Sequence, residues 1–294
     1  MWEIRFARLL SRLVLVLAVS ALCAAGAPAP TNQLPQGSFV SVKGGQIWYQ
    51  TCGNGTKALV LIHDGILHSA TWDAVWPLFC RDFHVVRYDR RGFGQSPAAT
   101  VSYSPLDDLS AVMRAASIGH AVLVGSASGG GLAVDFTLAH PDAVDGLVLV
   151  GPSVSGLSYS NYFTVRLAAF EQRFRRGDID GAIRNSWYLA PGHDVIRKKV
   201  VDILRANPQD MAHPDPALPL PAAKPLLSTI AKPTLILVGE FDAPDNHAQA
   251  GALEALIPGA KRVVVPGSGH LLYLERPDAF AGLTEPFAKT ALTK

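Results

Sequence analysis

The stretch from residue 120 to residue 141, HAVLVGSASGGGLAVDFTLAHP, decides the fold. Its residues 121–124 form an unbroken apolar run, which is typical of a strand buried on both faces. Residues 125–131 are all small, and from Leu132 the apolar residues recur at helical spacing until Pro141. A strand, a tight turn of small residues and a helix indicate a nucleophile elbow, in which a strained turn exposes one side chain above the sheet.

The turn leaves two registers open for the residue at its apex. Centred between Gly125 and Gly129, the apex is Ala127, which carries no nucleophilic atom. Centred one residue later, the apex is Ser128, whose hydroxyl can serve as a nucleophile. A purely structural glycine turn is a further alternative. A phosphate-binding loop is disfavoured because no lysine follows the glycines and several strands precede them.

The N-terminus is typical of a secretory signal peptide over residues 1–25. Three arginines precede an apolar run from Leu13 to Cys23, which is short for a membrane span, and cleavage after Ala25 fits the small-residue rule. An uncleaved N-terminal anchor is the alternative. We expect a periplasmic or secreted protein that keeps no stable membrane span after cleavage.

The composition favours a globular protein with a large buried core. Of the 294 residues, 49% are hydrophobic and 17% are charged, and the formal net charge is +2. The segment 1–25 carries three arginines and one glutamate, so it accounts for that +2 and the remainder is near neutral. This charge gives no basis for nucleic-acid binding.

Further along the chain, apolar strand-like runs alternate with helical patterns, which predicts a mostly parallel sheet with helices on both faces. The expected strands cover residues 38–42, 46–51, 58–63, 84–88, 121–124, 146–150, 234–238 and 262–265, and the expected helices residues 72–79, 106–116, 132–140, 246–256 and 280–289. Residues 26–37 read as a proline-rich linker. A core of residues 38–152 and 230–294 is interrupted by an expected helical cap at residues 153–229.

Several motifs recur in a specific order along this core. They are His63-Asp64-Gly65 with Trp72, the loop YDRRGFGQS at 88–96, the elbow with His140-Pro141, Gly239-Glu240-Phe241-Asp242, and Gly267-Ser268-Gly269-His270. The set resembles the α/β-hydrolase superfamily over nearly the whole span from residue 37 to residue 287. That resemblance implies an eight-stranded α/β-hydrolase fold with an inserted cap, and the chain order nucleophile, acid, histidine.

The chemistry of these residues agrees with an acyl-transfer site. His270 lies in a glycine-flanked loop after the last strand, where it can act as a base towards the elbow, and Asp242 can fix its tautomer. Glu240 and Asp245 compete for the role of the acid, but Asp242 matches the family position. The predicted catalytic set is therefore Asp242 and His270, together with Ser128 if it is the nucleophile.

The elbow departs from the family pattern, because spacing counted from His140-Pro141 places Ala127 where the nucleophilic serine stands. Three interpretations remain: Ser128 serves after a shift of one residue, the Asp242–His270 pair acts as a base without a covalent nucleophile, or the protein is a catalytically dead ligand-binding pseudo-hydrolase. An aspartate-nucleophile mechanism is excluded because no aspartate occupies the apex.

The oxyanion hole implied by the family uses the backbone N–H groups of Gly65 and Ser128. Asp64 stands where a glycine is commoner, so its carboxylate must point away or be paired. We interpret His63 as structural. His63 and His68 lack a third ligand at sensible spacing, so no metal is predicted, and no cofactor is implied.

After signal cleavage only Cys52 and Cys80 remain. In the family's sheet order the strands beside these cysteines are neighbours, at the end away from the active site, which implies a Cys52–Cys80 disulfide in an exported protein.

The expected function is the hydrolysis of a small ester or lactone by a monomeric enzyme. Aromatic residues of the cap either favour an apolar or aromatic substrate or form the cap's own core. They are Tyr159, Tyr162, Phe163, Trp187 and Tyr188.

Overall fold

The computed structural model describes residues 36–207 and 215–292, so the expected signal peptide and most of the expected linker lie outside the described residues. An eight-stranded sheet in the order β1-β2-β4-β3-β5-β6-β7-β8 forms the centre of the fold. The prediction of an α/β-hydrolase fold is confirmed. Within the described residues, no helix is long and apolar enough to cross a membrane.

The strands are β1 (Ser38–Val42), β2 (Gly45–Cys52), β3 (Ala58–Ile62), β4 (His84–Tyr88), β5 (Ala121–Ser126), β6 (Val144–Val150), β7 (Thr234–Gly239) and β8 (Lys261–Val265). The helices are η1 (Ser69–Trp72), α1 (Trp76–Phe79), α2 (Pro105–Ala115), α3 (Ser128–Ala139), η2 (Pro141–Ala143), α4 (Asn161–Arg175), α5 (Ile179–Arg184), α6 (Asp194–Ala206), η4 (Lys224–Thr229), α7 (Pro244–Leu256), α8 (Leu272–Glu275) and α9 (Pro277–Ala291).

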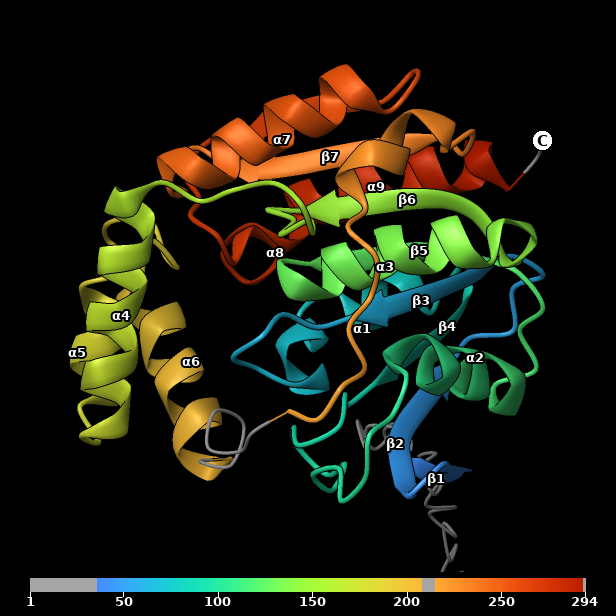
Figure 1. The fold of residues 1–294 in the computed structure, drawn as a ribbon, viewed down its shortest axis with the longest axis horizontal. Coiled ribbons are helices and arrows are strands. Elements are labelled where there is room, and N and C mark those ends of the chain that lie inside the picture. Colours follow the sequence, from blue (N-terminus) through green and yellow to red (C-terminus); the bar gives the residue numbers. More distant parts are fainter. Residues whose placement is uncertain (1–35, 208–214, 293–294) are drawn as a thin grey trace, which may run out of the picture. The chain divides into compact units, whose positions relative to one another are not determined.

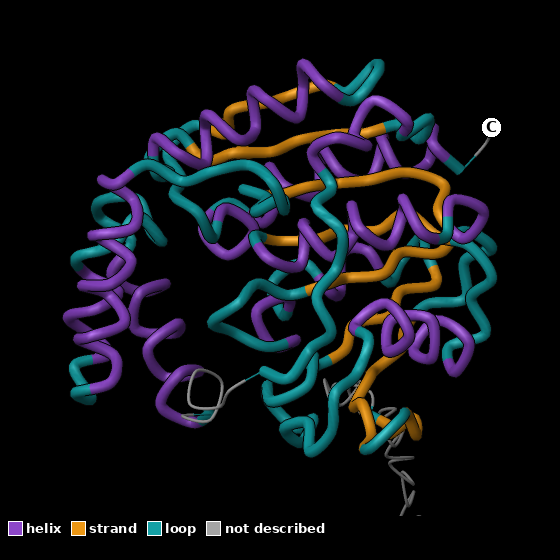
Figure 2. Tube along the Cα trace, viewed as in Figure 1, coloured by secondary structure: helices purple, strands orange, loops and turns teal. Residues whose placement is uncertain are grey.

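Helices cover both faces of the sheet (Figures 1 and 2). Strand β2 pairs antiparallel with β1 and β4, whereas every other pair of neighbouring strands is parallel. The side chains of the fully buried β3 point alternately to the two faces of the sheet. Leu59 and Leu61 join the core under α1, α8 and α9, and Val60 and Ile62 join the core under α2, α3 and α7. This is why β3 reads as a continuous apolar run.

Two helix predictions need correction. Helix α3 begins at Ser128, four residues before the expected start at Leu132, because the three glycines that form its first turn carry no apolar signal. The single helix expected over 72–79 is instead the short η1, which ends at Trp72, followed by the short α1, which begins at Trp76.

The predicted disulfide is confirmed. Cys52 ends β2, Cys80 directly follows α1, and their Cα atoms are 5.4 Å apart. Cys52 stands opposite Val85 in the antiparallel pairing of β2 with β4, so the bond fastens α1 to this side of the sheet.

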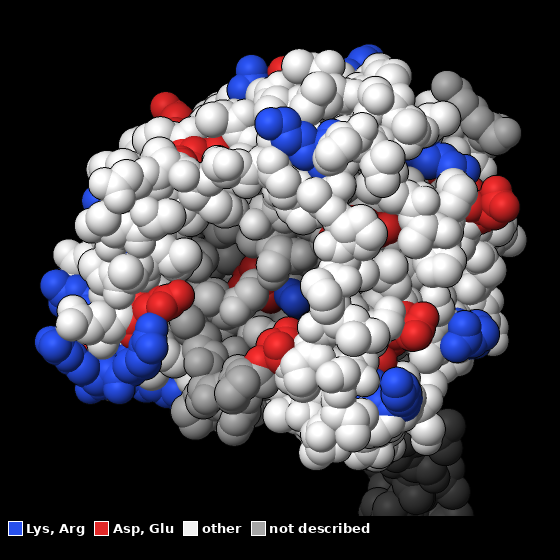
Figure 3. All heavy atoms as spheres, viewed as in Figure 1, with Lys and Arg blue, Asp and Glu red and all other residues white. Residues whose placement is uncertain are grey.

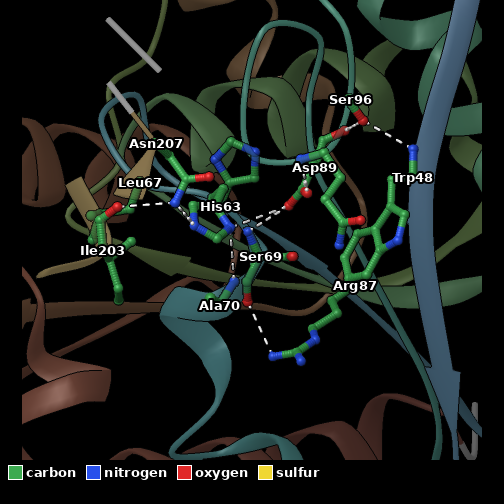
Figure 4. Close-up of polar contacts among 12 residues, drawn as sticks. Trp48, His63, Leu67, Ser69, Ala70, Arg87, Asp89, Ser96, Ile203 and Asn207 are labelled. Carbon is green, nitrogen blue, oxygen red and sulfur yellow. Dashed lines mark hydrogen bonds and ion pairs between the residues drawn. The ribbon is translucent and has the colours of Figure 1, made fainter. Parts of the chain in front are cut away.

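The helical insertion α4–α6 lies between β6 and β7, and it stands beyond the ends of the strands in Figure 1. Figure 3 shows a hollow in the surface between this insertion and the α/β core. Acidic and basic side chains lie at the bottom of the hollow. At one border, the Asn207 side chain contacts Nε2 of His68 at 2.9 Å, and Figure 4 shows Asn207 beside the core loop that contains Ser69.

Candidate active site

The elbow turn places Ala127 at its apex. Ala127 joins β5 to α3 with φ 48° and ψ −116°, a region that residues with a side chain rarely adopt. Gly129 permits the close approach of the turn to β3, because a Cβ at that position would overlap the carbonyl oxygens of Ile62 and His63. The backbone therefore has the strained geometry of a nucleophile elbow, with a half-buried methyl group at its apex.

Ser128 is the first residue of α3, and its hydroxyl faces the loop that follows β3. Its Oγ accepts a hydrogen bond of 2.8 Å from Nη1 of Arg90. A Cβ built on Gly65 would lie 3.1 Å from the same oxygen, so the two expected oxyanion residues are neighbours. Among the described residues, no hydrogen bond joins Ser128 to His270. This geometry favours the register with Ala127 at the apex, and a catalytic role for Ser128 remains a prediction.

His270 and Asp242 form a buried pair beside the elbow. Nδ1 of His270 lies 2.9 Å from Oδ2 and 3.1 Å from Oδ1 of Asp242, and the two residues are 4% and 7% exposed. A Cβ on Gly151, at the end of β6, would touch both side chains, so this glycine leaves room for the pair. The Nε2 atom of His270 has no hydrogen-bond partner within the described chain, which leaves it available to a substrate or to water.

Two opposing effects set the pKa of His270. Burial lowers this pKa, but the negative charge of Asp242 and its hydrogen bond raise it more, so the pKa is above its ordinary value. Asp242 also accepts hydrogen bonds from the N–H of Ala243, at 2.7 Å, and from the amide of Asn246, at 2.6 Å. These donors hold in place the carboxylate that orients the imidazole.

The other candidate acids have different partners. Glu240 is exposed, and its Oε2 accepts from the N–H of Gly267 at 2.8 Å. Asp245 accepts from the N–H and the hydroxyl of Ser160, at 2.5 and 2.8 Å, and so holds the start of α4. Of the three carboxylates, Asp242 alone lies beside His270.

The insertion holds the histidine loop through the backbone. The N–H groups of His270 and Leu271 donate to the carbonyl oxygens of Trp187 and Tyr188, at 3.2 and 3.0 Å. Glu275 adds a second connection: its carboxylate accepts from the N–H of Gly269 and from the N–H of Ala190, both at 2.7 Å. The position of His270 therefore depends on the insertion as well as on the core.

The loop after β3 resolves the question of Asp64. Its Oδ1 accepts from the N–H groups of Ile66 and Leu67, at 2.7 and 2.9 Å, and its Oδ2 accepts from the hydroxyl of Tyr273 at 3.0 Å. The carboxylate is thus paired, and it shapes the loop that presents Gly65. The N–H of Gly65 has no partner in the described part of the chain.

The cap aromatics divide into three groups. Phe163 and Trp187 are buried together, and Tyr159 stacks on Phe163 with ring centroids 4.2 Å apart. Tyr188 is buried against the main core, and its ring lies edge-on to His270 at 5.5 Å. Tyr162 is 55% exposed. Most of these residues therefore pack within the insertion, and the ring of Tyr188 packs against the ring of His270.

Three residues at the site had no role assigned from the sequence. Asn246 and Glu275 act through hydrogen bonds formed only in the fold, although each lies within five residues of a predicted catalytic residue. Arg90 lies directly before Arg91 in the YDRRGFGQS motif, and this place in the motif was the sequence feature that could have identified it as a site residue. Within the described ranges, no group of three or more His, Cys, Asp or Glu residues is arranged to hold a metal ion.

The sheet order, the elbow and the histidine–aspartate pair define the α/β-hydrolase class. The model of the alpha/beta hydrolase family matches residues 59–283, and the chain belongs to this family.

The chain is similar to known esterases and to a lactone-degrading enzyme. Pimeloyl-[acyl-carrier protein] methyl ester esterase of Edwardsiella ictaluri is 25% identical over 260 residues, which cover 82% of this chain and 97% of that protein. The solved structure of Est816, described as an N-acyl homoserine lactone degrading enzyme, is 27% identical with a TM-score of 0.71, covering 85% of this chain and 100% of that one. A thermophilic esterase from Thermogutta terrifontis is 26% identical with a TM-score of 0.73, covering 87% and 99%.

Proposed function

We propose that this protein hydrolyses small esters or lactones, with His270 as a general base that activates water directly. The single observation that carries the proposal is the intact His270–Asp242 pair beside an elbow whose apex is Ala127. The substrate class is supported by the methyl ester esterase and the lactone-degrading enzyme to which the chain is similar.

The reaction follows from the positions of the groups. Nε2 of His270 takes a proton from water as the water oxygen attacks the carbonyl carbon, and the N–H groups of Gly65 and Ser128 stabilise the oxyanion. When the intermediate collapses, the bond to the leaving oxygen breaks and the protonated His270 returns the proton to that oxygen. The products are a carboxylic acid and an alcohol, or a hydroxy acid from a lactone. No acyl-enzyme forms, because the methyl group of Ala127 cannot attack.

The test is hydrolysis of p-nitrophenyl acetate and of a small lactone by the parent protein and by His270→Ala. We expect steady-state hydrolysis without a burst, reduced roughly 10²- to 10⁴-fold in His270→Ala, the range for general acid–base catalysis. The variant His140→Gln, at the exposed residue that follows α3 at the opposite end of that helix from Ser128, is the control and should keep the parent rate.

Two results would overturn the proposal. Hydrolysis by the parent no faster than by His270→Ala would favour a protein that binds a ligand without catalysis. A burst with an acyl group on Ser128 would establish the shifted register, in which the Arg90 guanidinium beside Ser128 Oγ lowers the cost of the alkoxide.

A further inference from the structure

Arg90 is a half-buried cation without an acidic partner at the candidate site. Its Nη1 donates to Ser128 Oγ at 2.8 Å and lies 3.4 Å from the carbonyl oxygen of Asp64. No carboxylate in the described part of the chain lies within ion-pair distance of the Arg90 guanidinium. The neighbouring arginines differ, because Arg87 pairs with Asp73 and Arg91 pairs with Asp108, each at 2.6 Å.

The fold holds Arg90 in this position. Its N–H donates to Nε2 of His63 at 2.9 Å, which fastens the start of the motif loop to the loop after β3. Asp89 fastens the same two loops, since its carboxylate accepts from the N–H of Ser69 at 2.8 Å (Figure 4). The same carboxylate accepts from the N–H of Gln95, also at 2.8 Å. The guanidinium also lies over the ring of Phe93, 5.6 Å from its centroid. The cation is therefore preorganised, with little conformational freedom to lose on binding.

The groups around Arg90 donate hydrogen bonds. A serine hydroxyl that accepts from a guanidinium keeps its own proton for donation, so Ser128 presents an O–H as well as its backbone N–H. The N–H of Gly65 belongs to the same neighbourhood, because a Cβ there would lie 3.1 Å from Ser128 Oγ. The positive charge of Arg90 also acts on a buried neighbour. The pKa of His63 is lowered first by burial and second by the Arg90 charge.

A serine hydrolase needs these donors only for the transient oxyanion, and it does not need a permanent cation beside them. A guanidinium without a carboxylate partner, in a half-buried site rich in donors, is instead suited to a ligand that brings its own negative charge. A planar guanidinium matches a carboxylate in particular. On the histidine side, Tyr188 packs edge-on against His270 and places an aromatic ring beside the base.

We propose that Arg90 and Ser128 bind a carboxylate, and that the preferred ligands of this site are apolar or aromatic carboxylic acids and esters that carry a free carboxylate near the reacting carbonyl. The proposal deepens the proposed function and rests on it for the reacting group. The binding of a carboxylate itself requires no turnover, so the two can fail separately.

The experiment is calorimetric titration with phenylacetate and with phenylacetamide, its neutral isostere, and with hexanoate and hexanamide as a second pair. We expect at least one carboxylate to bind the parent protein at least ~10-fold more tightly than its amide, the usual size of a hydrogen bond to a charged group. In Arg90→Gln this preference should disappear, and Arg90→Lys should recover part of it. His270→Ala, which removes turnover, should keep a clear preference for the carboxylate.

The matched control is Arg166→Gln, which removes one exposed arginine from α4 and should leave the preference unchanged. Circular dichroism of each variant establishes that it is folded. The proposal is overturned if neither carboxylate binds at millimolar concentration, if the amides bind as tightly as the carboxylates, or if folded Arg90→Gln and Arg90→Lys both keep the parent's preference. A loss of preference in Arg166→Gln would also overturn it, because it would show a general effect of charge.

Discussion

His63 and His270 are two buried histidines that follow the carboxyl ends of parallel strands in one sheet, yet their pKa values move in opposite directions. His63 directly follows β3 and is 0% exposed, and His270 lies in the loop after β8 and is 4% exposed. Burial, helped by the nearby Arg90 cation, lowers the pKa of His63 to about 4. Burial also lowers the pKa of His270, but Asp242 raises it more, to a value above normal.

The hydrogen bonds explain the difference in function as well as in charge. Nδ1 of His63 donates to the carbonyl oxygen of Asp64 at 2.7 Å, and its Nε2 accepts from the N–H of Arg90 at 2.9 Å. Both ring nitrogens are used, and both partners are backbone groups. His270 uses only Nδ1, towards the Asp242 carboxylate. Burial beside a cation, with both ring nitrogens bonded to the backbone, thus produces a neutral, structural histidine, whereas burial with a carboxylate and one free nitrogen produces a base.

The largest expected effect comes from Asp242→Asn, which gives His270 a neutral partner like that of His63. A general base must be neutral, so the parent's kcat/KM should rise with pH through an inflection above 6.5, the ordinary pKa of histidine. Without the Asp242 charge, burial dominates and the inflection should move below 6.5. The rate above the inflection should fall roughly 10³-fold, because the imidazolium formed in the reaction loses its stabilising charge.

The pH profile of ester hydrolysis checks this, with Glu240→Gln as the matched control on the same loop. Glu240→Gln should keep both the rate and the inflection of the parent. An Asp242→Asn protein with the parent's profile would mean that the pair is structural, as His63 is.

The second effect concerns His63 and is smaller. Because its folded pKa of about 4 lies below the unfolded value of 6.5, the unfolded chain binds a proton that the folded chain does not. Stability is therefore lost as the pH falls below 6.5, by about 2 kcal/mol between about pH 7 and about pH 5. His270 has the opposite sign, and its contribution is lost as the pH rises through its raised pKa.

Urea unfolding at these two pH values tests the assignment to His63. In His63→Gln the loss of stability on acidification should be about 2 kcal/mol smaller than in the parent. The exposed His140→Gln should show the parent's loss. If the parent and His63→Gln lose equal stability on acidification, groups other than His63 cause the acid sensitivity, and the assignment is wrong.

The sequence predicted the frame of the site because each part has a local signature. The apolar run of β5, the small-residue turn and the glycine-flanked His270 are readable without the fold. Sequence left the apex open between Ala127 and Ser128, since the decisive quantity is a backbone angle, and the structure gives the positive φ to Ala127.

Other parts of the site depend on contacts between distant segments and had no local signal. The second carboxylate oxygen of Asp64 is paired by Tyr273, which lies more than two hundred residues away in the chain. The isolation of the Arg90 charge likewise depends on the carboxylates that Arg87 and Arg91 engage and Arg90 does not. The cap aromatics could be named from the sequence, but their division between packing and the site required the fold.

The central claim is that a working base stands beside an apex that lacks only a nucleophilic atom, and Ala127→Ser tests it most directly. The measurement is fluorophosphonate labelling with peptide mapping, alongside hydrolysis of a p-nitrophenyl ester. We predict no labelling of the parent, labelling of Ala127→Ser at residue 127, and a gain in hydrolysis of at least ~100-fold that His270→Ala abolishes. Labelling of the parent at Ser128, or a folded Ala127→Ser protein that neither labels nor gains activity, would contradict the account.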